Sequence, residues 1–314
     1  PPPPPRHYGW AWYQRKFTLP AFCAGQRVVL RFGSVTHTAK VWLNGQLIAQ
    51  HKGGFTPFEA DVTDLLRPGE TVLLTVACDN RVNHGTLPVG NEEGQLAFFG
   101  SDNAGIPSVE AAKRAAAPQN RPNFDFFNYA GIHRPVVLYT TPKEYIEDVT
   151  VVPHTDGRVD YRIQTVGAAP VAVTVLDADG NAVTSAEGIE GTLTIPEVQL
   201  WEPKPGVPYL YTLHIICGAD VYDQTFGVRS IEVRGTQVLL NGKPLYFKGF
   251  CKHEDFTAHG RGFDPVLNVK DVNLIHWANA NAVRTSHYPY AEEFYDLCDR
   301  EGILVMDETP AVGI

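Results

Sequence analysis

The stretch of residues 281–290 reads NAVRTSHYPY, and residues 303–308 read ILVMDE. The pattern is typical of a short apolar strand, a polar loop, a helix and a second strand. Arg284 and His287 stand where the first of these strands ends, and the carboxyl ends of strands are where a β/α barrel keeps its chemistry. The sequence therefore predicts that a β/α barrel, with a site at its rim, begins within residues 235–314.

Helices and strands alternate in this part of the chain. Apolar residues recur at helical spacing over residues 266–280, a strand is predicted at 282–283, and a second helix at 291–300 precedes a strand at 303–306. Strands that alternate with helices predict a parallel sheet. A closed barrel needs about 250 residues, so we expect only its first βα units here, and we expect this segment not to fold stably by itself.

The preceding residues have the short alternating runs of β-proteins. Over residues 10–139 these runs are separated by turn signals such as Asn44-Gly45, which favours a hairpin because both positions tolerate positive φ. The spacing predicts a jelly-roll β-sandwich. Residues 145–232 carry further alternating runs, whose number fits an immunoglobulin-like β-sandwich. A second hairpin is predicted at Asn241-Gly242, between strands at 238–240 and 245–247.

We therefore divide the chain into three domains. Residues 1–142 form the jelly-roll domain, residues 143–234 the immunoglobulin-like sandwich, and residues 235–314 the incomplete start of a (β/α)8 barrel. A Gly-, Asn- and Pro-rich loop over residues 84–123 is too long for a plain connector. It could act as an active-site lid or as a subunit contact, and the sequence leaves both open.

Composition excludes several classes of protein. The net charge of −9 argues against a nucleic-acid partner, and basic residues form no run that would suggest a membrane surface. No apolar stretch is long enough to span a bilayer. The five cysteines are far apart and include no Cys-x-x-Cys, so we expect buried free thiols. The absence of an Asn-x-Ser/Thr acceptor slightly favours the cytoplasm, with secreted and lysosomal locations left open.

Polar residues follow each of the three predicted barrel strands. They are the clusters His253-Glu254-Asp255, Arg284 with His287 and Tyr288, and Asp307-Glu308. Three clusters at the same topological position predict a site at one rim. The histidines match no metal-ligand spacing, so no metal site is expected. Asp125 lies among phenylalanines, where it could form a turn or accept hydrogen bonds from sugar hydroxyls. Both interpretations stay open.

Several runs, in order along nearly the whole chain, carry a resemblance to a known family. They are 124–134 (FDFFNYAGIHR), 138–142 (LYTTP), 226–229 (FGVR), 241–244 (NGKP), 252–255 (KHED), 260–264 (GRGFD) and 284–293 (RTSHYPYAEE). Together they resemble the family 2 glycoside hydrolases. The first and last of these runs look most like the branch of the family that acts on β-D-glucuronides.

The resemblance implies a jelly-roll, an immunoglobulin-like sandwich and a TIM barrel. It also implies retaining hydrolysis through two glutamates, by way of a covalent glycosyl-enzyme. Neither glutamate motif occurs here, so we expect both catalytic residues beyond Ile314, and the chain looks short at both ends. By resemblance Asp125 and His287 bind the sugar, Arg284 lies near the nucleophile and helps keep it ionised, and His253 belongs to the same rim.

The expected activity is the hydrolysis of terminal β-D-glucuronides by the parent enzyme, with no cofactor. The 314 residues alone should show no turnover. One alternative is a β-galactosidase or β-mannosidase of the same family. Another is a non-catalytic carbohydrate-binding protein. The expected partners are a glycoside substrate and further copies of the same chain in a homo-oligomer.

Overall fold

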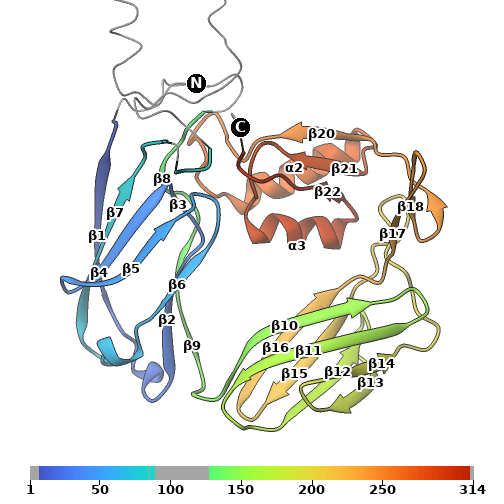
Figure 1. Ribbon diagram of the computed structural model, residues 1–314, viewed down its shortest axis with the longest axis horizontal. Coiled ribbons are helices and arrows are strands. Elements are labelled where there is room, and N and C mark those ends of the chain that lie inside the picture. The colour runs from blue at the N-terminus through green and yellow to red at the C-terminus, as the bar shows by residue number, and fades with distance from the viewer. Residues whose placement is uncertain (1–6, 84, 89–126, 312–314) are drawn as a thin grey trace, which may run out of the picture.

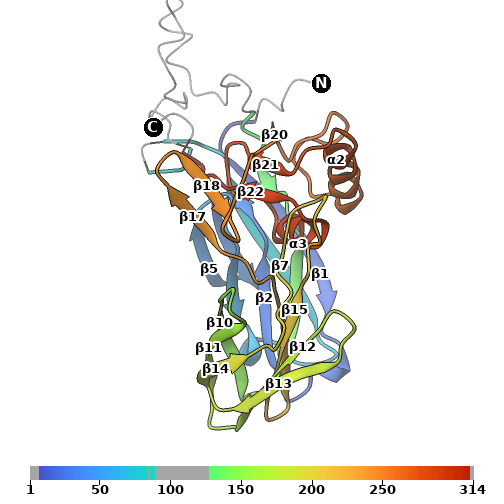
Figure 2. The ribbon, with the colours of Figure 1, turned by 90° about the vertical axis from the view of Figure 1, so that its right-hand side faces the viewer.

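The computed structural model describes residues 7–83, 85–88 and 127–311. Most of the described structure is β-sheet, with few helices. Figure 1 shows a first set of strands in blue, a second in green to yellow, and a part in orange and red that contains the two α-helices. Figure 2 shows the same parts after a quarter turn. The third part lies against the first, and a buried ion pair joins the two beside the candidate site.

The first part is built from sheets that enclose one core. One sheet has the order β1-β7-β4-β5, the second has the order β6-β2-β9, and β3 pairs with β8. The strands are β1 (Trp10–Thr18), β2 (Arg27–Phe32), β3 (Val35–Thr36), β4 (Thr38–Leu43), β5 (Gln46–Lys52), β6 (Phe58–Asp61), β7 (Thr71–Asp79), β8 (Gly131–Ile132) and β9 (Val136–Thr141). Two short 3-10 helices are η1 (Ala21–Cys23) and η2 (Thr63–Leu65). Phe32, Val41 and Val76 are buried between the sheets.

The second part also consists of two sheets around a core. Their orders are β10-β11-β14 and β13-β12-β15-β16. The strands are β10 (Tyr145–Pro153), β11 (Arg158–Val166), β12 (Val171–Leu176), β13 (Ala182–Glu187), β14 (Glu190–Thr194), β15 (Tyr211–Cys217) and β16 (Asp220–Phe226). Ile163 from one sheet and Val173 and Leu213 from the other are buried in the same cluster. The alternation of apolar and polar residues along the strands predicts such a core between two sheets.

The third part begins with an antiparallel hairpin and continues as a parallel sheet. The hairpin strands are β17 (Ile231–Arg234), β18 (Gln237–Leu240) and β19 (Lys243–Pro244). The parallel strands β20 (Gly249–Lys252), β21 (Ala282–Thr285) and β22 (Leu304–Met306) alternate with α2 (Pro265–Trp277) and α3 (Glu292–Glu301). The parallel sheet that the alternating pattern predicts is therefore present.

The structure differs from two expectations drawn from the sequence. Residues 245–247 form no strand: the pairing after Asn241-Gly242 ends at Pro244, and Tyr246 is 80% exposed. Cys251 is exposed, whereas the other four cysteines are buried. The apolar letters at 245–247 suggested a strand, but the chain leaves the hairpin there and crosses to β20.

One side of α2 is not covered by the described residues. Val266, Val269 and Trp277 are exposed there, and Trp277 exposes 86% of its surface. None of the helices in the described ranges is long and apolar enough to cross a membrane.

Candidate functional site

The three parallel strands bring the predicted polar clusters to one edge of the sheet. Cys251 on β20 pairs with Arg284 on β21, and Arg284 pairs with Met306 on β22. The strands are parallel, so their carboxyl ends meet at the same edge. The residues that follow, from His253, Ser286 and Asp307 onward, are therefore neighbours, and we call this edge the rim.

Glu308 lies at the centre of the rim cluster. Its Oε1 accepts a hydrogen bond from Nε of Arg284 and forms an ion pair with the same guanidinium. Its Oε2 lies 2.9 Å from Nδ1 of His287. The hydrogen bond to the Cys251 sulfur and the pairing with Glu308 raise the pKa of Arg284. One carboxylate thus holds two of the predicted site residues.

The neighbouring carboxylate, Asp307, has a different set of partners. Its Oδ1 accepts hydrogen bonds from Thr285 Oγ1 at 2.7 Å and from Tyr295 OH at 2.6 Å. Thr285 Oγ1 in turn accepts from the backbone N–H of Glu308 at 3.0 Å. Asp307 therefore ties β21, α3 and the end of β22 together, and it fixes the backbone that carries Glu308.

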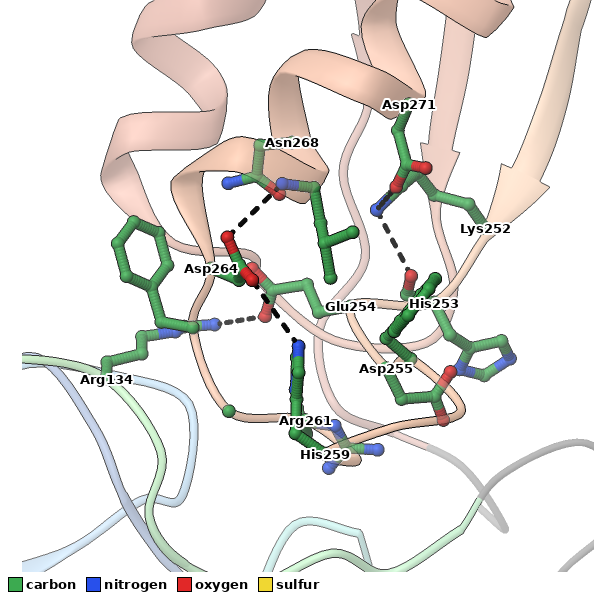
Figure 3. A pocket seen from close by; sticks show the side chains of 14 residues that line it. Arg134, Lys252, His253, Glu254, Asp255, His259, Arg261, Asp264, Asn268 and Asp271 are labelled. Atoms are coloured by element: carbon green, nitrogen blue, oxygen red, sulfur yellow. Dashed lines mark hydrogen bonds and ion pairs between the residues drawn. The ribbon is translucent and has the colours of Figure 1, made fainter. Parts of the chain in front are cut away.

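His253 contacts His287 across the rim. Their ring centroids are 5.5 Å apart and the ring planes are nearly perpendicular, at 76°. In Figure 3, His253 and Asp255 lie on one side of a small pocket, and Glu254 and Arg134 lie on another. The structure therefore brings together three of the four residues predicted for substrate binding. The fourth, Asp125, lies outside the described residues, as does most of the 84–123 loop.

A buried ion pair joins the first part of the chain to the rim. Arg134, between β8 and β9, pairs with Glu254 at 3.0 Å, and the two side chains are only 6% and 9% exposed. Figure 3 shows them facing each other. Arg134 also donates to the Pro289 carbonyl at 2.5 Å, and Glu254 Oε1 accepts from the N–H of Ala291 at 2.6 Å. The pair thus holds both ends of the loop that follows His287.

Arg261 forms a second buried contact between these parts. Its guanidinium lies 4.2 Å from the ring centroid of Tyr288 and 5.3 Å from that of Phe55. It donates to the Phe127 carbonyl at 3.0 Å. Phe127 is two positions after Asp125 in the sequence. A cation packed between aromatic faces is attracted by the ring quadrupoles, so Arg261 anchors the described end of the segment that contains Asp125.

One buried histidine, His37, and one half-buried histidine, His133, lie beside the contact between the first part of the chain and the rim, which we call the joint. His37 Nε2 is 2.6 Å from Asn128 Oδ1, and His133 Nδ1 is 2.9 Å from Thr36 Oγ1. Burial and, to a smaller extent, the nearby charge of Arg261 lower the pKa of His37 to about 4. Burial, followed by the positive charges of Arg261 and Arg134, holds the pKa of His133 well below its usual range. Both imidazoles are therefore neutral near pH 7.

Comparison with known proteins identifies the family. Residues 1–142 match the sugar binding domain of the glycosyl hydrolases family 2, residues 144–229 match a second model of that family, and residues 231–314 match its TIM barrel domain. The chain belongs to glycosyl hydrolase family 2. These models account for both β-rich parts and for the parallel strands that carry the rim.

Individual relatives match this family 2 chain along almost all of its length. A beta-glucuronidase from Paenibacillus borealis is 43% identical over 98% of this chain and 51% of the relative. One from Canis lupus familiaris is 44% identical, over 98% of this chain and 48% of the relative. The chain thus spans about half the length of the curated relatives that it matches.

Solved structures show the same fold. The structure of a Faecalibacterium prausnitzii beta-glucuronidase is 91% identical, with a TM-score of 0.93 over 98% of this chain and 52% of that one. A Bifidobacterium dentium beta-glucuronidase complexed with coumarin-3-O-glucuronide is 50% identical, with a TM-score of 0.90 over 98% of this chain and 53% of that one.

Several residues of this family 2 site were not singled out by sequence reasoning. Arg134 and Arg261 stood inside runs quoted only for the resemblance, and Glu308 was placed in a rim cluster without a role. No local signal predicts that residues 134 and 254 meet, because the contact spans 120 positions. Among the described residues, no group of three or more His, Cys, Asp or Glu side chains is arranged to hold a metal ion.

Proposed function

We propose that the protein containing this chain is a β-glucuronidase, which hydrolyses terminal β-D-glucuronides with retention at the anomeric carbon. The observation that supports this most is the rim cluster of Arg284, His287 and Glu308, in a chain that is 43% identical to a beta-glucuronidase over 98% of its length. The solved relative complexed with coumarin-3-O-glucuronide supports a glucuronide as the substrate.

The rim residues act on the substrate side of the reaction in this proposal. His287 and His253 have ring nitrogens that can exchange hydrogen bonds with sugar hydroxyls. Arg284 is a fixed positive charge that favours an ionised carboxylate nearby. Asp125 is proposed as an acceptor for sugar hydroxyls, on the resemblance of its run. The two glutamates of the retaining mechanism are expected beyond Ile314, and hydrolysis of this kind needs no cofactor.

The finer architecture also belongs to the proposal. We assign the sandwich of residues 1–142 to the jelly-roll type and that of residues 143–234 to the immunoglobulin-like type. Residues 235–314 would supply the first βα units of a (β/α)8 barrel. The two facing sheets in each of the first two parts, and the three parallel strands of the third, support this assignment.

A substrate panel tests the function directly. The protein containing this chain should hydrolyse 4-nitrophenyl β-D-glucuronide, and it should hydrolyse the matching β-galactoside and β-mannoside at least a hundredfold less efficiently. The C6 carboxylate that distinguishes the glucuronide should be recognised by charged groups, and removing such a contact is costly. Preference for the galactoside or mannoside would contradict the proposed substrate and would assign the protein to the β-galactosidase or β-mannosidase alternative. Sugar binding without turnover of any member would favour the carbohydrate-binding alternative.

A further inference from the structure

Glu308 lies between two residues to which the proposed function gives roles in the substrate site. Arg284 comes from β21, His287 from the loop after it, and Glu308 from the residues after β22. The carboxylate uses one oxygen for each partner: Oε1 for the guanidinium and Oε2 for Nδ1 of the imidazole at 2.9 Å. The side chains of Glu308 and His287 are 22% and 24% exposed, so this contact is mostly shielded from water.

We propose that Glu308 is a positioning residue for sugar binding, which fixes the tautomer of His287 and the orientation of Arg284. This proposal rests on the proposed function. A carboxylate can only accept, so the neutral imidazole must carry its proton on Nδ1 to bond with Glu308. Nε2 is then the acceptor nitrogen of the ring. A sugar hydroxyl would donate its proton to that nitrogen.

The neighbouring groups show why this role belongs to Glu308. Asp307 is committed to Thr285 and Tyr295, at 2.7 and 2.6 Å. Its contacts fix the backbone N–H of Glu308 through Thr285. The negative charge of Glu308 also matters for the orientation of Arg284. Arg284 is 40% exposed and has a long side chain, which can adopt many rotamers in the absence of an ionic partner. Charge-assisted hydrogen bonds are stronger than neutral ones and set a more defined geometry.

The chain offers a matched control. Glu301 on α3 also lies between a histidine and a basic residue, with Oε2 at 3.6 Å from His276 and at 3.6 Å from Lys204. None of these three residues belongs to the rim clusters. The pair of variants E308Q and E301Q therefore removes one carboxylate charge from a His–Glu–cation cluster at the rim and from a similar cluster elsewhere.

Two measurements test the proposal. Two-bond 1H–15N spectra of the imidazoles should show His287 as the Nδ1–H tautomer in the wild-type protein. In E308Q the amide can donate to Nδ1, so the Nε2–H tautomer should become populated. For hydrolysis of the β-D-glucuronide, E308Q should lower kcat/KM at least tenfold, mainly through a higher KM, whereas E301Q should stay within twofold of the wild type.

The outcomes distinguish failure of the role proposed for Glu308 from failure of the proposed function. A wild-type His287 in the Nε2–H form would overturn the role of Glu308 without any variant being made. So would an E308Q enzyme whose kcat/KM lies within twofold of the wild type. A variant with lower activity but an unchanged His287 tautomer would also contradict the proposal. If the wild-type protein does not hydrolyse the glucuronide, the proposed function fails, and the tautomer spectra alone decide whether Glu308 positions His287.

Discussion

At the scale of single residues, the Arg134–Glu254 pair gives the sharpest prediction. Both side chains are nearly inaccessible to water, at 6% and 9% exposure, so replacing Arg134 leaves a buried carboxylate without its counter-charge. Such a loss costs about 3–5 kcal/mol. We expect R134M to lower the free energy of unfolding in urea by that amount. The double variant R134M/E254Q should be less destabilised than the sum of the two single variants, because each removes the same interaction.

An exposed pair of the same residue types provides the control. Arg234 and Glu232 pair at 2.9 Å with side chains that are 68% and 52% exposed. Exposed ion pairs contribute about 0–1 kcal/mol. R234M should therefore change the free energy of unfolding by no more than about 1 kcal/mol. Equal effects of R134M and R234M would mean that the buried pair does not hold the joint.

The exposed thiol of Cys251 gives a second prediction at this scale. Four of the five cysteines are buried, and burial raises the pKa of Cys78 and Cys298 to about 12, so their reactive thiolate forms are scarce. In the native 314-residue chain we expect one thiol to react rapidly with Ellman's reagent, and five after denaturation. The variant C251S should lose the rapid phase. Fast reaction of two or more thiols in the native chain would contradict the burial pattern.

At the scale of elements, the start of α2 depends on one side chain. Asp264 Oδ1 accepts from the N–H groups of Val266 at 2.9 Å and Leu267 at 3.3 Å, and Pro265 occupies the first turn. Removing such a cap costs about 1 kcal/mol. We therefore expect D264A to lower the free energy of unfolding by about 1 kcal/mol, whereas D264N, which keeps an acceptor oxygen, should lie close to the wild type. Equal losses in both variants would assign the effect to charge instead.

Elements with local signals could be predicted from the sequence. The Asn44-Gly45 hairpin lies where expected, with φ of 47° and 84° at the two positions, because few other residues adopt these angles readily. The strands β13 and β16 gave no signal. Both are edge strands of one sheet; β13 buries none of its residues and β16 buries only Phe226, so their sequences lack apolar alternation. Exposure at an edge thus explains why these two strands could not be predicted.

The candidate site also contains some residues that could be predicted from the sequence and others that could not. The positions of His253, Arg284 and His287 at one rim followed from the order of strands and helices. The partners that orient them did not, because Arg134 and Glu308 meet their partners only after the chain has folded. Pairing across 120 positions depends on how two parts pack, and no pattern within a window of sequence records it.

At the scale of the whole molecule, the joint between the first part and the rim contains buried groups whose protonation in acid should destabilise the fold. His37 is buried on the sandwich side, close to Arg261 on the rim side, and its folded-state pKa is about 4 against an ordinary value of 6.5. The unfolded chain therefore binds more protons between these two pH values. Stability is complete above pH 6.5 and declines as the pH falls toward 4, because protonation favours the unfolded state.

The size of this effect follows from the shift, and H37Q isolates it. A shift from 6.5 to about 4 corresponds to about 3 kcal/mol of stability lost over that range. Glutamine can still donate to Asn128 but cannot be protonated, so the urea unfolding free energy of H37Q should fall less than that of the wild type between pH 7 and pH 4. H7Q, which replaces an exposed histidine, tests whether loss of any histidine has the same effect. Parallel curves for H37Q and the wild type would show that acid acts on the joint through other groups, of which His133 is the first to examine.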